Sequence, residues 1–352
     1  MEIKELLIIT KEKDASDLHI NVEAPPVLRI NGKLEKLNLP ELTSQNTHEM
    51  IYSILNERQK GDFEKYGELD LSYELANVAR FRINVFKHRR GEGAAFRLIP
   101  EKIKTLSELN LPTIISSFTE KDKGLVLVTG PTGSGKSTTI AVLIDIINKN
   151  RYDNIITIED PIEFIHSHKN CLVSQREIGS HTKSFASALR NVLREDPDVI
   201  LVGEMRDLET ISMTLTAAET GHLVFSTLHT INAAETVERI IDVFPPHQQN
   251  QVRMQIAGSI LGIIAQTLLP TLDGTGRVPA LEVMIANPAI RNLIREGKVY
   301  QIPSTIQISK KDGMQSLDQS LKDLVMEGKI SREDAIRKAI DKKTFMENRY
   351  TY

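Results

Sequence analysis

Residues with the types and spacing of a phosphate-binding loop lie in the middle of the chain. Gly130, Gly135 and the pair Lys136-Ser137 match the pattern G-x-x-x-x-G-K-[ST]. Glycines let successive backbone N–H groups converge on one anion, a lysine brings positive charge to the outer phosphates, and a serine hydroxyl is a ligand for Mg²⁺. The candidate nucleotide-binding residues are Gly130, Pro131, Thr132, Gly133, Ser134, Gly135, Lys136, Ser137 and Thr138, with Ser137 as the candidate Mg²⁺ ligand.

The segments on both sides of this loop support a nucleotide site. Residues 125–128 form a continuous apolar run that predicts a buried strand, and residues 138–149 carry apolar side chains at helical spacing. A helix that begins at the loop adds the positive end of its dipole to the site. Glycine-rich turns also join strands to helices without binding a ligand, but strand, loop and helix in this order favour nucleotide binding.

A carboxylate follows a second apolar run. Residues 199–202 predict a buried strand, and Gly203 and Glu204 come directly after it. Many phosphate-loop enzymes carry at the end of this strand an aspartate that helps to hold Mg²⁺, and Gly203 occupies that position here. Glu204 is therefore our candidate for the base that activates water, while Mg²⁺ would be held by Ser137, phosphate and water. The alternative role for Glu204 is a salt bridge with Arg206.

Further acids and two histidines lie near the ends of other predicted strands. Glu159, Asp160 and Glu163 follow the strand predicted at residues 155–158, and we favour Glu163 for a role in the site. Acidic loops are more often only solvated. His222 precedes the strand predicted at residues 223–226, and His229 follows it. Either histidine could sense the γ-phosphate, and we favour His222, although a lone histidine is more often structural.

Composition limits the class of protein. The chain has 352 residues, 40% of them hydrophobic and 26% charged, which predicts a globular protein of about two domains. The net charge of −3 gives no electrostatic indication of a nucleic-acid partner. A single cysteine, Cys171, excludes an intrachain disulfide and a tetracysteine zinc site. With no signal peptide or transmembrane segment in the pattern, we expect a cytoplasmic protein that meets the membrane only through partners.

The first hundred residues predict a small α+β domain. Residues 27–30 and 33–37 form a hairpin around an Asn31-Gly32 turn, and residues 43–65 have helical spacing. Three strand-like runs follow, at residues 69–75, 78–86 and 93–99. Arginines are dense here, at positions 80, 82, 89, 90 and 97, and the simplest explanation is a solvated sheet face.

The remainder alternates between strand and helix, which predicts a mainly parallel sheet with helices on both faces. Residues 101–123 are expected to be a linker with a short helix, residues 124–280 the ATPase core, and residues 281–352 a helical region. The helices of the core are expected at residues 138–149, 184–193, 209–219, 233–241 and 248–269. Asn287 and Pro288 mark the start of a further helix that ends near Gly297.

Several motifs in a fixed order make the chain similar to one known family, the secretion-ATPase (GspE/PilT-like) superfamily and, within it, the motors that retract type IV pili. The resemblance covers essentially the whole chain. Its marks are residues 15–19 (ASDLH), the loop 130–137, the acidic box 157–163, the segment 203–207 (GEMRD), the histidine box 220–229 and residues 289–296 (AIRNLIRE).

The resemblance implies an ATP-hydrolysing motor that drives pilus retraction and twitching motility from the cytoplasmic side of the inner membrane. It implies a homohexamer of two-domain subunits, each with a PAS-like N-terminal domain and a RecA-like P-loop motor domain, that acts on an inner-membrane pilus platform protein. ATP would bind between the two domains. By family analogy, catalytic roles fall on Glu204, Glu163, His222, Arg82, Arg97, Arg190 and Arg194.

Three alternatives stay open at this point. The first is a PilU-like accessory paralogue, which could also be a partner of this motor. The second is a RecA-like ATPase that translocates nucleic acid, and the third is a regulatory nucleotide-binding subunit without turnover. Assembly ATPases of the same superfamily carry an additional N-terminal domain and a tetracysteine zinc element, and the single Cys171 argues against that group.

Overall fold

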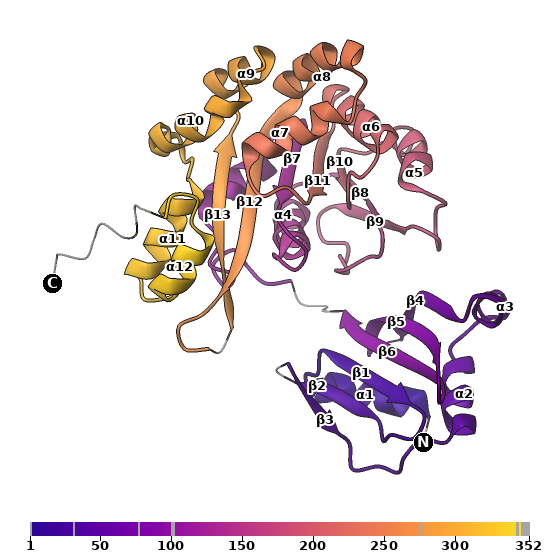
Figure 1. The fold of residues 1–352 in the computed structure, drawn as a ribbon. Coiled ribbons are helices and arrows are strands. Elements are labelled where there is room, and N and C mark those ends of the chain that lie inside the picture. The colour runs from indigo at the N-terminus through magenta and orange to yellow at the C-terminus, as the bar shows by residue number, and fades with distance from the viewer. Residues whose placement is uncertain are drawn as a thin grey trace. The chain divides into compact units, whose positions relative to one another are not determined.

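The computed structural model describes residues 2–30, 32–76, 78–99, 103–274, 276–342 and 345. The chain divides into two compact units, Met1–Lys102 and Ile103–Tyr352, each with its own hydrophobic core (Figure 1). Asn31, which we expected in a hairpin turn, and Pro100, at the expected domain boundary, lie outside the described residues.

Among the residues described, the first unit forms a six-stranded antiparallel sheet with the strand order β3-β2-β1-β6-β5-β4. The elements are α1 (Ile3–Glu12), β1 (Asp17–Asn21), β2 (Val27–Ile30), β3 (Lys33–Lys36), α2 (Ser44–Tyr52), α3 (Glu57–Tyr66), β4 (Glu68–Leu75), β5 (Ala79–His88) and β6 (Gly91–Ile99). Alternate strand residues such as Leu18 and Phe96 are buried in one core with helix residues such as Leu7. The predicted α+β domain is confirmed, while its PAS-like character stays a prediction.

The predicted elements of this unit are present, with one subdivision. The hairpin of residues 27–37 is confirmed, since Ile30 pairs with Lys33 directly across the turn. The helical pattern of residues 43–65 corresponds to two helices, because the side chain of Asn56 caps the start of α3. Helix α1 and strand β1 were not predicted.

The described part of the second unit contains a seven-stranded sheet with the order β13-β12-β7-β11-β10-β8-β9. All neighbouring strands are parallel except β13, which is antiparallel to β12. Its strands are β7 (Gly124–Thr129), β8 (Asn154–Glu159), β9 (Leu172–Glu177), β10 (Val199–Val202), β11 (Leu223–Leu228), β12 (Ile260–Pro270) and β13 (Arg277–Ile285).

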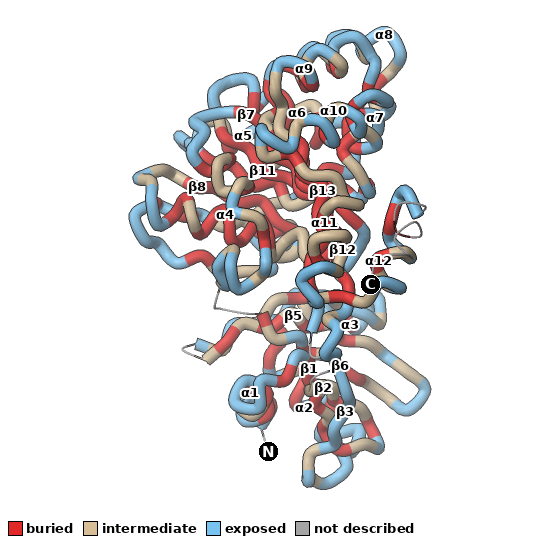
Figure 2. The backbone as a smooth tube through the Cα atoms, turned by 90° about the vertical axis from the view of Figure 1, so that its left-hand side faces the viewer, coloured by how far each residue is buried: buried red, intermediate tan, exposed pale blue. Residues whose placement is uncertain are grey.

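Helices cover both faces of this sheet. They are η1 (Thr113–Glu120), α4 (Lys136–Asn150), α5 (Phe185–Val192), α6 (Leu208–Glu219), α7 (Ala233–Asp242), α8 (Pro246–Ser259), α9 (Pro288–Arg295), η2 (Val299–Gln301), α10 (Ile302–Ile308), η3 (Lys310–Asp312), α11 (Leu317–Met326) and α12 (Arg332–Lys338). Val126 and Val128 of β7 pack with α4 and η1, whereas Leu125 and Leu127 pack with residues of α5 to α9 on the other face. The central strands β7, β10 and β11 are therefore buried along their whole length, and stretches of buried residues, in red, run through the interior of this unit in Figure 2.

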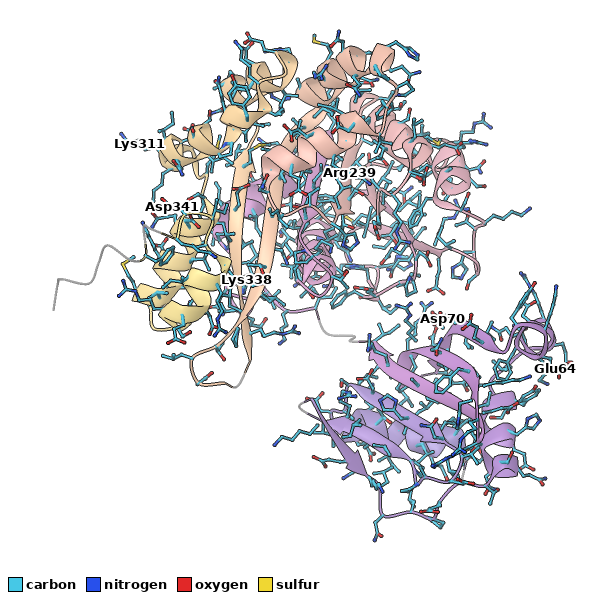
Figure 3. All side chains as sticks on the ribbon, viewed as in Figure 1. Glu64, Asp70, Arg239, Lys311, Lys338 and Asp341 are labelled. Carbon is cyan, nitrogen blue, oxygen red and sulfur yellow. The ribbon has the colours of Figure 1, made fainter. Side chains whose placement is uncertain are left out.

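The outer faces of these helices carry charged side chains, such as Arg239 on α7 (Figure 3). Within the described residues, no helix is both long and apolar enough to cross a membrane.

The sequence prediction was wrong at the end of the core. The single helix expected over residues 248–269 ends at Ser259, and the chain continues as strand β12. A Cβ added at Gly262 would lie 2.8 Å from the carbonyl oxygen of Met284 and closer still to the Phe118 ring, so the chain at Gly262 packs directly against β13 and η1. Residues 281–285, which we assigned to the C-terminal helical region, belong to β13.

The segment expected to be a linker belongs to the second unit from residue 103 onward. Ile115 and Phe118 of η1 are buried in the core beneath β7 and α4. Strand β9, which was not predicted, extends the sheet beyond β8.

The outer edge of β13 is covered by residues that lead into and form α11. The Leu281 N–H donates to Ser320 Oγ at 3.1 Å, and Gln315 Nε2 donates to the Leu281 carbonyl at 3.0 Å. The backbones of Val283 and Gln315 also exchange a pair of hydrogen bonds. These contacts satisfy backbone groups that would otherwise face outward from the edge of the sheet.

Candidate active site

The phosphate loop connects the end of β7 to the start of α4. Gly130, Gly133 and Gly135 have φ values of 139°, 76° and 88°, a region that favours glycine. A Cβ added at Gly130 would lie 2.7 Å from Ser134 Oγ, so space as well as backbone conformation requires glycine there. Gly135 caps the N-terminus of α4, whose first residues are Lys136 and Ser137. The predicted strand, loop and helix are therefore confirmed.

Lys136 provides the positive charge of the phosphate loop. Lys136 Nζ donates to the carbonyl oxygens of Gly130 and Pro131, at 2.8 Å and 3.2 Å. Burial lowers the pKa of Lys136, and the negative charges of Glu204 and Glu163 oppose this change.

Hydroxyl groups around the loop have the properties that Mg²⁺ and phosphate require. Thr129 Oγ1 and Ser134 Oγ are buried and have no partner among the described residues. Over the same described ranges there is no cluster of three or more acidic, histidine or cysteine side chains that could hold a metal. The Ser137 hydroxyl together with substrate oxygens and water fits Mg²⁺, which commonly retains water and takes few protein ligands.

Glu204 lies beyond the end of β10, on the edge of the sheet where β7 leads into the loop. Its Oε2 accepts a hydrogen bond from Arg206 Nη2 at 2.8 Å, and its Oε1 lies 3.1 Å from His229 Nε2. Burial by itself would raise the pKa of Glu204, but Arg206 and His229 outweigh it and hold this pKa below its ordinary value. The salt bridge that we considered as an alternative is present, and it leaves Glu204 ionised as a base must be.

Gly203 explains why no aspartate ends β10. A Cβ at this position would lie 3.2 Å from the carbonyl oxygen of Ile158 and 3.3 Å from Cα of Glu159. The Gly203 N–H also donates to that carbonyl at 2.8 Å. A side chain here would therefore require strands β8 and β10 to move apart by a few tenths of an ångström.

The acidic box divides into one buried and two exposed carboxylates. Glu159 has 9% of its surface exposed and accepts hydrogen bonds from Thr157 Oγ1 at 2.6 Å and Gln175 Nε2 at 3.2 Å. Burial raises the pKa of Glu159, against these hydrogen bonds. Asp160 and Glu163 are exposed, and the negative charge of Glu163 acts to raise the pKa of Lys136, which supports the preference for Glu163.

Gln175 is a residue that the sequence analysis missed, because β9 was not predicted. Besides Glu159, its amide donates to the Phe164 carbonyl at 2.9 Å and accepts from the His166 N–H at 2.8 Å. It therefore fixes the loop that carries Glu163.

The two histidines lie at opposite ends of strand β11. The carbonyl oxygen of His222 accepts from the N–H of Gly124, at the start of β7, whereas the phosphate loop follows the end of β7. The six-residue strand between them corresponds to about 20 Å. The Nδ1 atom of His222 lies 2.9 Å from the Ala217 carbonyl, at the end of α6. This position argues against His222 as a phosphate sensor within its own chain, and His229, in contact with Glu204, is the histidine of the site.

Two of the predicted arginines, Arg190 and Arg194, belong to the second unit but lie away from its phosphate-loop site. Arg190 on α5 is exposed and forms an ion pair with Glu209 of α6. Arg194 is also exposed, and it follows the end of α5. The next residue, Glu195, accepts a hydrogen bond through its carbonyl from the side chain of Asn154 at 2.9 Å, and Asn154 is the first residue of β8. The start of β8 lies at the end of the parallel sheet opposite to the phosphate loop.

Arg82 and Arg97 belong to the first unit, where they are direct partners on neighbouring strands β5 and β6. Arg97 Nε donates to Oδ1 of Asp17 at 2.9 Å, and Asp17 also pairs with Arg29. Asp17 is the acidic residue of the ASDLH motif. Because the single negative charge of the buried Asp17 lies between the positive charges of Arg29 and Arg97, this part of the sheet keeps a net positive charge.

Comparisons with known proteins give a consistent result. The profile of the family "Type II/IV secretion system protein" matches residues 3–337. The chain is 53% identical over 96% of its length to the type IV pilus retraction ATPase PilT of Pseudomonas aeruginosa, covering 98% of that protein. It is 41% identical over 96% of its length to the type IV pilus ATPase PilU of the same organism, covering 89% of it. A crystal structure of the pilus retraction motor PilT with bound ADP superposes with a TM-score of 0.92 at 48% identity, covering 98% of each chain.

Proposed function

Because the chain belongs to the family of type II/IV secretion system proteins, we propose that it is the ATPase motor that retracts type IV pili and so powers twitching motility. The observation that carries the proposal is the position of Glu204, which follows β10 at the same end of the parallel sheet at which the phosphate loop follows β7. A loop that binds phosphate and carboxylates that can handle water are the parts that hydrolysis of ATP needs. The chain is closer in sequence to PilT than to PilU, which favours the retraction motor over an accessory paralogue.

ATP binds to residues 130–138. Lys136 exchanges the carbonyl oxygens of Gly130 and Pro131 for phosphate oxygens, and the free hydroxyls of Thr129 and Ser134 lie beside the loop. Ser137 would hold Mg²⁺, which supplies positive charge to the outer phosphates when it is bound. The N–H groups at the start of α4 add the favourable end of the helix dipole.

Glu204 accepts the proton of the attacking water. Its contacts with Arg206 and His229 keep it ionised in the absence of nucleotide, and the same contacts hold the carboxylate at the end of β10. His229 is the residue that links the base to the start of α7, because only residues 230–232 separate the two. Glu163 assists from the neighbouring loop that Gln175 fixes.

The motor acts as a homohexamer at the cytoplasmic face of the inner membrane. Arg82, Arg97, Arg190 and Arg194 offset phosphate charge in the assembled ring, where exposed arginines of one subunit can reach the nucleotide of the next. The work is delivered to an inner-membrane platform protein of the pilus, and a PilU-like paralogue is a second partner. Nucleic acid is not a substrate, in line with the net charge of −3.

The test is the ATPase rate and the solution mass of the wild-type chain and of Glu204→Gln, with Mg·ATP and without nucleic acid. We expect a hexamer whose turnover falls by about 10²–10⁴ in the variant while ATP still binds. Glu238→Gln, an exposed acid on α7, is the matched control and should keep full activity. Unchanged turnover in Glu204→Gln would contradict the assigned base, and a wild type without turnover would favour a regulatory subunit.

A further inference from the structure

A buried amide on β12 contacts the phosphate loop from outside the nucleotide site. Gln266 is buried, with only 4% of its surface exposed. Its Nε2 donates to the Ser134 carbonyl at 2.6 Å, and its Oε1 accepts from Thr139 Oγ1 at 2.9 Å. The two partners lie on either side of Gly135, Lys136 and Ser137, so one side chain spans the central part of the loop.

The backbone of β12 supports the same contact. Ala265 pairs with Thr129, the last residue of β7, which brings the next residue of β12 to the start of the loop. A Cβ added at Gly130 would collide with the Gln266 carbonyl oxygen, and one added at Gly135 would lie 3.1 Å from Gln266 Nε2. Two of the loop glycines therefore allow the loop to lie directly against Gln266.

Glutamine suits this position because it offers a donor and an acceptor without charge. A buried polar group without a partner destabilises the conformation that buries it. Removal of the Gln266 amide would leave the Ser134 carbonyl and the Thr139 hydroxyl without these partners. A different backbone conformation of the loop would then be favoured. In that conformation the N–H groups of the loop no longer converge on one anion.

We propose that Gln266 is a positioning residue that holds the phosphate loop in its nucleotide-binding conformation. This inference rests on the proposed function only in assuming that ADP and ATP bind at residues 130–138. Gln266 acts through Ser134 and Thr139 and not on the phosphate itself. Strand β12, next to β7, thus sets the affinity of the loop for nucleotide. Glu204, the water-activating carboxylate that follows β10, is unaffected.

The experiment compares Gln266→Met with Gln315→Met in the full-length chain. Methionine has a volume similar to glutamine and lacks the amide. Gln315 donates from its own amide to the Leu281 carbonyl at the outer edge of β13, and neither this bond nor its backbone pair with Val283 involves the loop. Binding of a fluorescent ADP analogue with Mg²⁺ gives Kd, steady-state ATPase assays give KM and kcat, and thermal unfolding reports folding.

We expect Gln266→Met to weaken ADP binding by about tenfold, the loss typical for a buried polar group left without its partner. KM for ATP rises by a similar factor, and kcat changes by less than about twofold because Glu204 keeps its contacts. Gln315→Met keeps the wild-type Kd even if its melting temperature falls equally. A Kd within twofold of wild type in a folded Gln266→Met, or an equal loss of affinity in Gln315→Met, overturns the inference.

A second pair of variants covers the case in which Gln266→Met does not fold. Thr139→Val removes the hydroxyl that donates to Gln266, and Thr139→Ser retains it. Weaker ADP binding in Thr139→Val that Thr139→Ser restores supports the inference, and equal affinities of both variants contradict it. A wild-type chain that binds no ADP analogue would overturn the proposed function as well, so the two failures are distinguishable.

Discussion

Substitution of Gly203 by alanine tests the close approach of β8 and β10 beneath the site. The added Cβ would lie 3.2 Å from the Ile158 carbonyl oxygen and 3.3 Å from Cα of Glu159, and both atoms belong to the backbone of a buried strand. Neither can move aside as a flexible side chain would, and the hydrogen bond from the Gly203 N–H holds them in place. The strands must therefore separate by a few tenths of an ångström.

The magnitude follows from the usual effect of overpacking. Inserting a methyl group into a well-packed core destabilises a protein by about 1–3 kcal/mol. For a unit of this size, 1 kcal/mol corresponds to roughly 2–4 °C, so the melting temperature should fall by about 2–12 °C. Gly203→Asp adds a carboxylate next to the buried Glu159 and should be worse. Catalysis should suffer too, because the end of β8 leads into the loop of Glu163.

Thermal unfolding, ADP binding and kcat together check this prediction. ADP affinity should change little in Gly203→Ala, because the phosphate loop follows a different strand, β7. Gly258→Ala is the control, since no atom lies within 4 Å of its added Cβ and alanine favours the helix α8. A Gly203→Ala variant with the melting temperature and kcat of the wild type would refute the argument that space excludes a side chain at this position.

Three further predictions concern the site and its support. Because the pKa of Glu204 lies below the ordinary 4.5, its ion pairs stabilise the fold above pH 4.5 and lose this effect as the pH falls through the lowered pKa. Arg206→Gln should accordingly shift the acidic limb of the pH–kcat profile to higher pH, and an unshifted limb would count against the pairing. His229→Ala should lower kcat while His222→Ala leaves it near wild type in single-turnover ATPase assays, and the reverse order would return the sensor role to His222. Ile290→Ser on α9 should lower stability by about 3 kcal/mol in denaturant titrations, because Ile290 is fully buried, whereas the exposed Asn292→Ser should have no such effect.

The central strands and the phosphate loop were predictable because each has an unambiguous local pattern. Continuous apolar runs identify β7, β10 and β11, and the glycine and lysine spacing identifies the loop. Strand β12 was not predictable in this way, since an apolar run after a helix also fits a longer helix. The packing of Gly262 against Phe118 and Met284 is a tertiary contact that no local pattern contains. The role of Gln266 was hidden for the same reason.

The positions of the two histidines relative to the phosphate loop could have been predicted from the sequence. In a parallel sheet, residues that follow the strands gather at one edge and residues that precede them gather at the other. The phosphate loop and His229 follow their strands, whereas His222 precedes its strand. The preference for His222 rested on its position beside the strand and on the family resemblance. The pairing of Glu204 with Arg206 was considered from the sequence, whereas His229, which follows β11, and Gln175 on β9 were not predicted as partners of Glu204 and Glu159, because tertiary structure brings them together.

The covered edge of β13 limits how copies of this chain can associate. With Leu281 and Val283 already bonded to Ser320 and Gln315, this side of the sheet offers those backbone groups to no incoming strand. A second copy of the chain that approached this stretch of β13 would therefore meet side chains and would not extend the sheet through Leu281 and Val283. The same cover removes a template for amyloid-like pairing with another chain.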